Sequence, residues 1–190
     1  MVTLMKKLLL SSLIIAGTFA APTYALDIAD ITIQDQIVIE NNQQQLRGAG
    51  IRSKFFMDLY VCSLYNQSPL TADEIMAGET PASIQMNILS SMITSEKLTA
   101  SMEEGFENSA GDELPQIQDM VNQFTGAFSE PVSEGDQFRI VSLPDTGVSL
   151  YKNGKQLVTI NNEQFRRILL GIWLGDDPLS DDLKEEMMGE

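Results

Sequence analysis

Two arginines stand among apolar residues in the stretch from Leu46 to Tyr65, and they are the residues of this chain best suited to chemistry. The guanidinium groups of Arg47 and Arg52 stay protonated in proteins and are costly to bury without a partner. A guanidinium beside an apolar strand therefore needs an anion. Two interpretations are open: a structural ion pair with a carboxylate of the protein, or a site for the anionic head of a bound ligand.

Tyr60 lies eight positions after Arg52 and adds a phenol to the same stretch. An arginine fork can donate two parallel hydrogen bonds to a carboxylate, and a phenol can donate a third. The apolar neighbours suit an alkyl chain, because each buried methylene contributes about 0.8 kcal/mol. Arg52 and Tyr60 are therefore candidates for binding a small apolar carboxylate. The simpler interpretation of Tyr60 is a core residue of a sheet.

The spacing of this pair sets a geometric condition. On one straight strand the two residues would lie about 27 Å apart at the usual rise per residue. They can meet only if the chain reverses between residues 53 and 57. That segment contains no Gly, Pro or Asn, so its turn signal is weak. Residues 45–65 are accordingly predicted to form either one long strand or a hairpin.

Several absences exclude whole classes of function. The chain has no histidine, which removes Ser-His and Cys-His nucleophile pairs and histidine general bases. The single cysteine, Cys62, removes internal disulfides and CxxC sites, and we expect it to be a small buried hydrophobic residue. No phosphate-binding glycine motif is present. The net charge of −15 opposes binding to nucleic acid phosphates and to anionic lipid surfaces.

The first residues have the pattern of a signal peptide. Lys6 and Lys7 form a short positive region, and residues 8–21 are apolar but too short for an ordinary membrane span. Small residues follow, and cleavage after Ala25 is predicted. We therefore expect residues 1–25 to be a signal peptide and residues 26–190 to form one domain. The expected product is a soluble periplasmic protein with no stable membrane insertion after cleavage.

The elements that must position Arg52 and Tyr60 follow from the hydrophobic pattern. Alternating apolar residues predict strands, and spacing of three to four predicts helices. Asn153-Gly154 predicts a hairpin turn. The predicted strands cover 28–39, 45–65, 83–89, 138–143, 148–151 and 157–160; the predicted helices cover 71–77, 94–108, 115–124, 162–174 and 180–187. This order predicts an α+β fold, an antiparallel sheet with helices on one face.

Three segments together resemble the chalcone isomerase superfamily. They are GAGIRSKFFMDLYVCSLY at residues 48–65, Asp145-Thr-Gly147 with the hairpin to Lys155, and the closing helices from Phe165 to Met188. The resemblance covers about residues 27–190 and is strongest to an exported bacterial branch. It implies an open-faced β-sandwich, a large antiparallel sheet with helices on one side and a ligand cleft between them.

The resemblance also implies which residues face that cleft. In the plant isomerases an arginine and a threonine frame the cleft, and a helix supplies a tyrosine and an asparagine. Here Arg52 matches the arginine and Tyr60 the threonine, while Thr94 and Ser101 stand where the helix tyrosine and asparagine are expected. The non-catalytic fatty-acid-binding branch instead uses an arginine and a tyrosine. Arg52, Tyr60, Thr94 and Ser101 are thus the predicted ligand-binding residues.

The resulting hypothesis is a periplasmic, non-catalytic domain that binds a small apolar carboxylate such as a fatty acid, with no cofactor and no metal. One alternative is an isomerase or intramolecular lyase acting on an enone-like substrate, with Arg52 as the electrophile. The other is a structural factor whose acidic surface, from Asp181 to Glu186, binds a protein partner.

Overall fold

The computed structural model describes residues 25–190. The predicted signal peptide, apart from its last residue, lies outside the described residues. The described part forms a seven-stranded antiparallel sheet in the order β3-β4-β5-β6-β7-β8-β9, so that every strand pairs with its neighbour in sequence. The strands are β3 (Gln36–Ile39), β4 (Asn42–Lys54), β5 (Met57–Asn66), β6 (Ala82–Ile88), β7 (Gln137–Leu143), β8 (Gly147–Lys152) and β9 (Lys155–Ile160).

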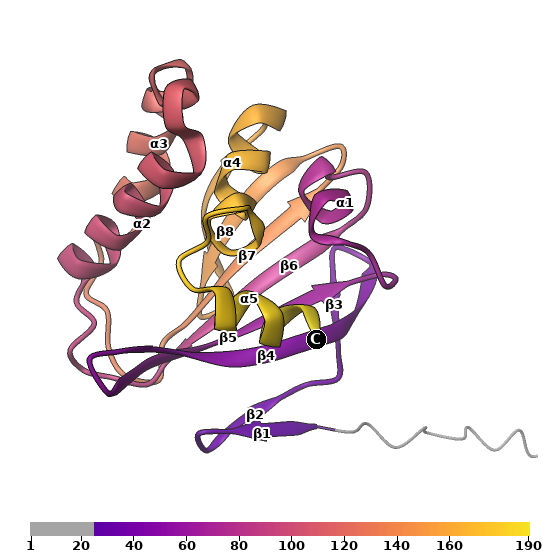
Figure 1. Ribbon diagram of the computed structural model, residues 1–190, viewed down its shortest axis with the longest axis vertical. Helices are drawn as coiled ribbons and strands as arrows, with labels where there is room; N and C mark the ends of the chain where they lie inside the picture. Colours follow the sequence, from indigo (N-terminus) through magenta and orange to yellow (C-terminus); the bar gives the residue numbers. More distant parts are fainter. Residues whose placement is uncertain (1–24) are drawn as a thin grey trace, which may run out of the picture.

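The helices gather over one face of this sheet, as Figure 1 shows. They are α1 (Ala72–Ala77), α2 (Ser95–Ala110), α3 (Leu114–Gly126), α4 (Glu163–Leu174) and α5 (Asp181–Met188), with a short 3₁₀ turn at Gly111–Glu113. Side chains that accept a backbone N–H cap four of them at Thr71, Thr94, Asn162 and Ser180. The predicted α+β fold with helices on one face is confirmed.

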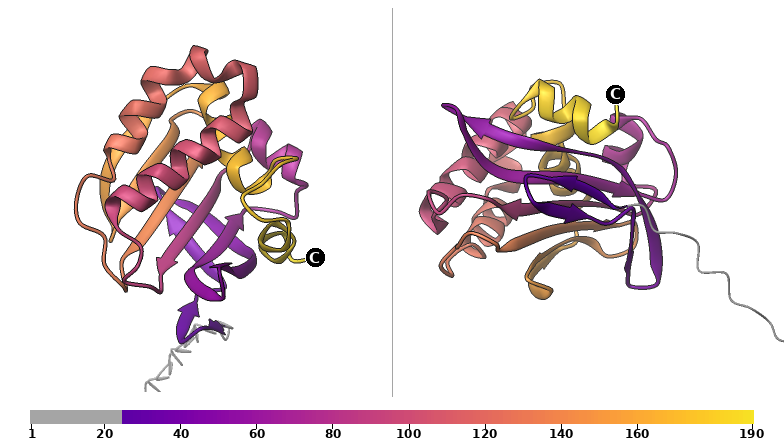
Figure 2. Two further views of the ribbon diagram at one scale, coloured as in Figure 1. Left: turned by 60° about the vertical axis from the view of Figure 1, so that its left-hand side comes forward. Right: turned by 90° about the horizontal axis from the view of Figure 1, so that it is seen from below.

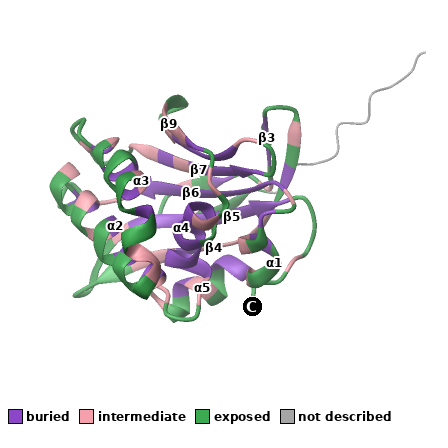
Figure 3. Cartoon of the chain, turned by 90° about the horizontal axis from the view of Figure 1, so that it is seen from above, coloured by how far each residue is buried: buried purple, intermediate pink, exposed green. Residues whose placement is uncertain are grey.

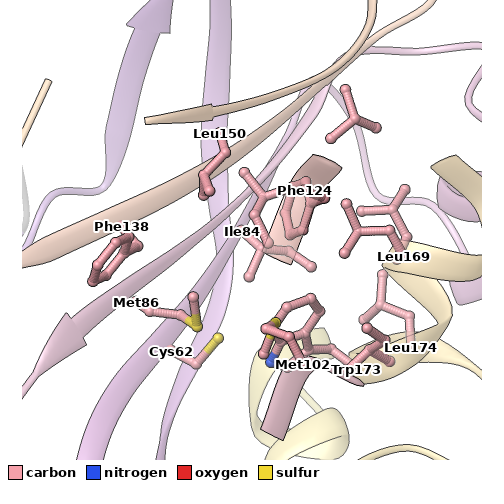
Figure 4. Packing of buried hydrophobic residues seen from close by; sticks show 14 of the residues in the cluster. Cys62, Ile84, Met86, Met102, Phe124, Phe138, Leu150, Leu169, Trp173 and Leu174 are labelled. Carbon is pink, nitrogen blue, oxygen red and sulfur yellow. The ribbon is translucent and has the colours of Figure 1, made fainter. Parts of the chain in front are cut away.

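The main core lies between the helices and the sheet because both layers are apolar on the inner side. Exposed residues face outward on α2 and α3, while the strands beneath are buried (Figure 3). Phe124 and Trp173 pack from the helices onto Ile84, Met86 and Phe138 of the sheet (Figure 4). Burial on this scale is the main force that holds the helices on the sheet.

Cys62 is fully buried in this core, as the sequence predicted. Burial raises the pKa of its thiol, so the sulfur stays protonated and chemically inert.

The opposite face of the sheet has a smaller core of its own. Strands β1 (Leu26–Ile28) and β2 (Ile31–Ile33) form a separate hairpin beside the large sheet (Figure 1). Ile33 and Ile37 pack there against Val61, Tyr65 and Val141. The β-rich N-terminal region therefore covers part of the face that the helices leave open. Within residues 25–190, no helix has the length and apolar character needed to cross a bilayer.

The Gly-x-Gly pattern in β4 is explained by the last helix. A Cβ atom on Gly48 would lie 2.1 Å from the Glu186 carbonyl oxygen, and one on Gly50 would collide with the Glu186 side chain. Glycine at both positions therefore lets α5 approach the strand. Arg47, next to this contact, is half-buried and its Nη2 donates to the Met188 carbonyl oxygen at 3.3 Å. A cation there also opposes the partial negative charge of the helix end.

Residues 45–65 form a hairpin, which decides between the two predicted alternatives. Strands β4 and β5 pair from Lys54↔Met57 outward, and Phe55 and Phe56 are the two turn residues. Both have positive φ, 51° and 62°, as a two-residue turn of the hairpin type requires. The weak turn signal in the sequence thus hid a tight reversal.

Candidate ligand-binding site

A cleft of about 480 Å³ lies at the end of the β4–β5 hairpin, between the hairpin and one side of α2. Its volume falls within the range of about 300–1,000 Å³ that is common for small-molecule sites. The strand side includes Arg52, Lys54, Phe55, Met57, Leu59 and Tyr60, the helix side includes Lys97, Leu98, Ser101, Glu104 and Asn108, and Leu179 precedes α5. The cleft is mostly apolar, with a few polar groups.

Arg52 and Tyr60 are direct partners across the β4–β5 ladder and both line this cleft. Side chains at opposed positions on one face of an antiparallel pair have Cβ atoms about 5 Å apart. The reversal at Phe55–Phe56 therefore turns a separation of eight residues into an adjacent pair. A guanidinium and a phenol stand side by side at one cleft.

Arg52 is half-exposed and has no carboxylate partner within the described residues. Its Nη1 donates to the Ser53 carbonyl oxygen at 3.0 Å. By contrast, Arg167 holds both carboxylate oxygens of Glu113, at 2.8 and 2.7 Å. The interpretation of Arg52 as a structural ion pair is wrong. Its guanidinium retains donors for an anion from outside the protein.

Tyr60 is 5% exposed and stays protonated. Burial raises the pKa of its phenol above the usual range, and the positive charge of Arg52 lowers it only in part. The Trp173 indole also lowers this pKa in part, although its buried N–H falls short of hydrogen-bond geometry. The phenol is therefore a hydrogen-bond donor at any physiological pH, which is the form that can bind a carboxylate.

Of the two ligand-binding residues predicted on the helix side, Thr94 and Ser101, one lies in the cleft. Ser101 lines the cleft from α2. Thr94 does not: it is the N-cap of α2, and its hydroxyl oxygen accepts the Lys97 amide at 3.3 Å. The assignment of Thr94 to the ligand site is corrected on this point, because a threonine just before a helix satisfies a free backbone N–H. Its hydroxyl is committed to the helix.

Two lysines line the cleft that sequence reasoning did not select. Lys54 is the last residue of β4, and its Nζ lies 5.9 Å from the centre of the Phe55 ring. Lys97, in the first turn of α2, donates to the Met92 carbonyl oxygen at 3.0 Å. Strand and helix periodicity gave no sign that these residues share a cleft. Their charge, rare in this acidic chain, was the available signal.

The match to known protein families agrees with this geometry. A family model described as chalcone isomerase-like matches residues 25–189, nearly all of the described part. The chain belongs to the chalcone isomerase-like family. The resemblance to this family inferred from the three sequence segments is thereby confirmed, while the exported bacterial branch stays a prediction. No curated protein matches the chain.

Among solved structures, the fold is similar to the crystal structure of an Arabidopsis thaliana fatty-acid binding protein. The TM-score is 0.68 at 15% sequence identity, and the match covers 87% of this chain and 96% of that one. At this identity the likeness establishes the shared fold of a chalcone isomerase-like domain. The chemistry of the cleft has to be argued from its own residues.

Proposed function

We propose that this chalcone isomerase-like protein binds a fatty acid, or a similar apolar carboxylate, in the cleft beside the β4–β5 hairpin. The observation that carries the proposal is the Arg52–Tyr60 pair. A permanent cation that pairs with no carboxylate of residues 25–190 stands next to a protonated phenol at an apolar cleft. The printed description of the Arabidopsis structure as a fatty-acid binding protein supports the same ligand class.

The head group would lie against Arg52 and Tyr60. Hydrogen bonds to charged groups are worth about 1.5–3 kcal/mol each when buried. The Arg52 guanidinium has donors left beyond its bond to Ser53, and the Tyr60 hydroxyl supplies one more. A carboxylate needs this combination, because its two oxygens accept several bonds in one plane.

The alkyl chain would lie along the apolar lining. Leu59 of β5, Leu98 of α2 and Leu179 of the segment before α5 give the cleft hydrophobic walls. Each methylene that leaves water contributes about 0.8 kcal/mol, so affinity rises with chain length until the cleft is full. The head group selects the chemical class and the walls select the length.

A non-catalytic role is supported by the helix side of the cleft. The tyrosine and asparagine positions carry Thr94 and Ser101, and the Thr94 hydroxyl caps α2. The remaining cleft groups hold and orient a ligand more readily than they transfer protons.

Titration of purified protein with fatty acids of increasing length tests the proposal. We expect Arg52→Ala to weaken binding at least about tenfold, and Tyr60→Phe by about tenfold, because each removes charge-assisted hydrogen bonds. Arg167→Ala is the matched control, since it removes the same side chain from an ion pair outside the cleft. Equal affinity of Arg52→Ala and the unchanged protein would contradict the head-group role.

A second measurement separates binding from catalysis. Solvent extraction and mass spectrometry of the purified protein identify the lipid that it carries, and a ring-closure assay with a chalcone tests for turnover. Recovery of fatty acid without turnover supports the binding role. Turnover that depends on Arg52 would favour the isomerase alternative.

The periplasmic location belongs to the same proposal. It is supported by the charge and apolar pattern of residues 1–25. Cell fractionation with mass spectrometry of the mature N-terminus tests it, and the expected first residue is Leu26. An intact N-terminus in the cytosolic fraction would contradict export.

A further inference from the structure

The turn between β4 and β5 breaks a rule that the other two-residue turns obey. Within residues 25–190, four hairpins have two-residue turns in which both φ angles are positive: Ala29–Asp30, Glu40–Asn41, Phe55–Phe56 and Asn153–Gly154. Left-handed backbone costs an ordinary residue about 1–2 kcal/mol, and Asn, Asp and Gly tolerate it best. Three turns carry one of these at the second position. The fourth carries phenylalanine at both.

The two phenylalanine rings also lie in water. Phe55 is 80% exposed and Phe56 is fully exposed. The large exposed apolar side chains of residues 25–190 number six, and four of them, Phe55, Phe56, Met57 and Met92, lie at this turn or at the cleft that it borders. In the right-hand view of Figure 2 the end of the β4–β5 hairpin projects at the edge of the molecule. The turn therefore pairs a strained backbone with unburied rings, and nothing in the folded core gains from either.

Cations line the cleft beside the same tip. The chain has twelve lysines and arginines, of which Lys6 and Lys7 precede the described residues, and three of the remaining ten line the cleft. They are Arg52, Lys54 and Lys97, against a single lining carboxylate, Glu104. In a protein with a net charge of −15 the cleft lining thus carries a local excess of positive charge, and the one further acid on the end of the hairpin, Asp58, accepts the Ser53 hydroxyl at 2.7 Å.

We propose that the Phe55–Phe56 turn is a docking surface for a phospholipid bilayer. The two rings enter the interfacial layer, the flanking Lys54 and the nearby Lys97 meet lipid phosphates, and the cleft opens at the membrane. Resting on the proposed function, this contact lets a fatty acid pass between bilayer and cleft without crossing water.

A bilayer fits these features as a single occupant. Interfacial binding grows with the apolar area inserted and with attraction of cations to anionic lipid. Lysine stems reach past apolar surface while the ammonium stays at the headgroups. The overall negative charge opposes approach, but its field is screened beyond about 8 Å at physiological salt. At contact, Arg52, Lys54 and Lys97 outnumber the nearby acids Asp58 and Glu104, so the lipid meets a local excess of positive charge.

The test is co-sedimentation with vesicles of phosphatidylcholine mixed with phosphatidylglycerol, and with phosphatidylcholine alone. We expect the unchanged protein to bind the mixed vesicles more tightly. Phe56→Gly should lower that binding about tenfold, since it removes one exposed ring. Glycine suits the φ of 62° and Phe56 does not line the cleft, so the hairpin is retained. Asn41→Gly is the matched control, at the same turn position of the β3–β4 hairpin.

Fatty-acid binding from vesicle-free solution separates this inference from the proposed function. If the protein binds fatty acid but ignores both kinds of vesicle, or if Phe56→Gly binds vesicles as well as the unchanged protein, the docking surface is overturned and the carrier role stands. If vesicle binding depends on Phe56 but no fatty acid binds, docking stands and transfer to the cleft is overturned. Transfer of a fluorescent fatty acid should speed up with vesicle concentration, and less so for Phe56→Gly.

Discussion

The β4–β5 and β8–β9 hairpins reverse the same sheet with the same kind of turn, but their turn residues differ. Asn153-Gly154 closes the second hairpin, and Asn153 is bound on both sides: its side chain accepts the Gln137 amide at 2.8 Å and donates to Asp136 at 2.8 Å. Phe55-Phe56 closes the first, and both rings face solvent. The Asn153-Gly154 turn therefore stabilises the sheet, and the Phe55-Phe56 turn does not.

The difference between the two turns shows that the Phe55-Phe56 turn lowers the stability of the fold. A two-residue reversal needs only backbone angles, which Asn and Gly reach at little cost. Phenylalanine reaches the same angles with strain and leaves apolar surface in water. Departures of this kind collect at functional sites. Here the departure stands beside the cleft that carries Arg52 and Tyr60.

Transplanting the phenylalanines is the strongest way to break this comparison. The double change Asn153→Phe, Gly154→Phe removes two side-chain hydrogen bonds and puts a Cβ atom on a residue with φ of 79°. We expect the free energy of unfolding to fall by about 3 kcal/mol. Urea denaturation measures it through the midpoint. A loss below about 1 kcal/mol would mean that turn chemistry matters little in this sheet.

Asp136→Asn tests how much the carboxylate that accepts a hydrogen bond from Asn153 stabilises the β8–β9 turn. Burial raises the pKa of Asp136, but hydrogen bonds from Asn153 and the Ser133 amide, with the ion pair to Lys152 at 3.0 Å, outweigh it and lower the pKa. A carboxyl with a depressed folded pKa adds stability above its unfolded pKa and loses it as pH falls through the folded value. We expect a loss of about 2 kcal/mol at neutral pH.

The pH dependence distinguishes this cause from a general defect. The difference between Asp136→Asn and the unchanged protein should begin to shrink at about pH 4, where the unfolded chain takes up its proton, and should vanish only below the lowered pKa of the folded chain. Urea midpoints measured at several pH values test this. A difference that stays constant into acid would show that the charge is not responsible.

The reverse exchange is expected to have the smallest effect and the opposite sign. Phe55→Asn with Phe56→Gly relieves two positive φ angles and removes the contact between Lys54 and the Phe55 ring, worth about 0.5 kcal/mol at an exposed site. We expect a net stabilisation of about 1 kcal/mol. Thermal unfolding measures it as a higher midpoint. An unchanged or lower midpoint would mean that the phenylalanine turn is not strained.

Most of the secondary structure was readable from local pattern. Thr71 and Ser180 cap the helices that follow them, and Asn153-Gly154 forms the predicted turn. These signals depend on neighbours in sequence, so they need no tertiary information. For residues 45–65 local pattern left two alternatives, one long strand or a hairpin. It did not favour the hairpin, because Phe55 and Phe56 disfavour the positive φ angles that the pairing of the two strands imposes.

The candidate site was readable only in part. Arg52, Tyr60 and Ser101 line one cleft, whereas Thr94 is held at a helix start and Lys54 and Lys97 were not foreseen. A residue type states what a side chain can do. Which side chains share a cavity depends on how a strand end and a helix start meet across many residues of chain.

The sequence alone determined most of the elements, their α+β order, and the presence of an arginine and a tyrosine able to bind an acid, because these follow from periodicity and residue chemistry; three short segments indicated the family. The tertiary structure decided that the two side chains are adjacent, that no carboxylate of the described chain pairs with Arg52, and that two phenylalanines stand exposed at the turn beside the cleft. Register and burial are properties of contacts between distant segments, and local pattern does not contain them.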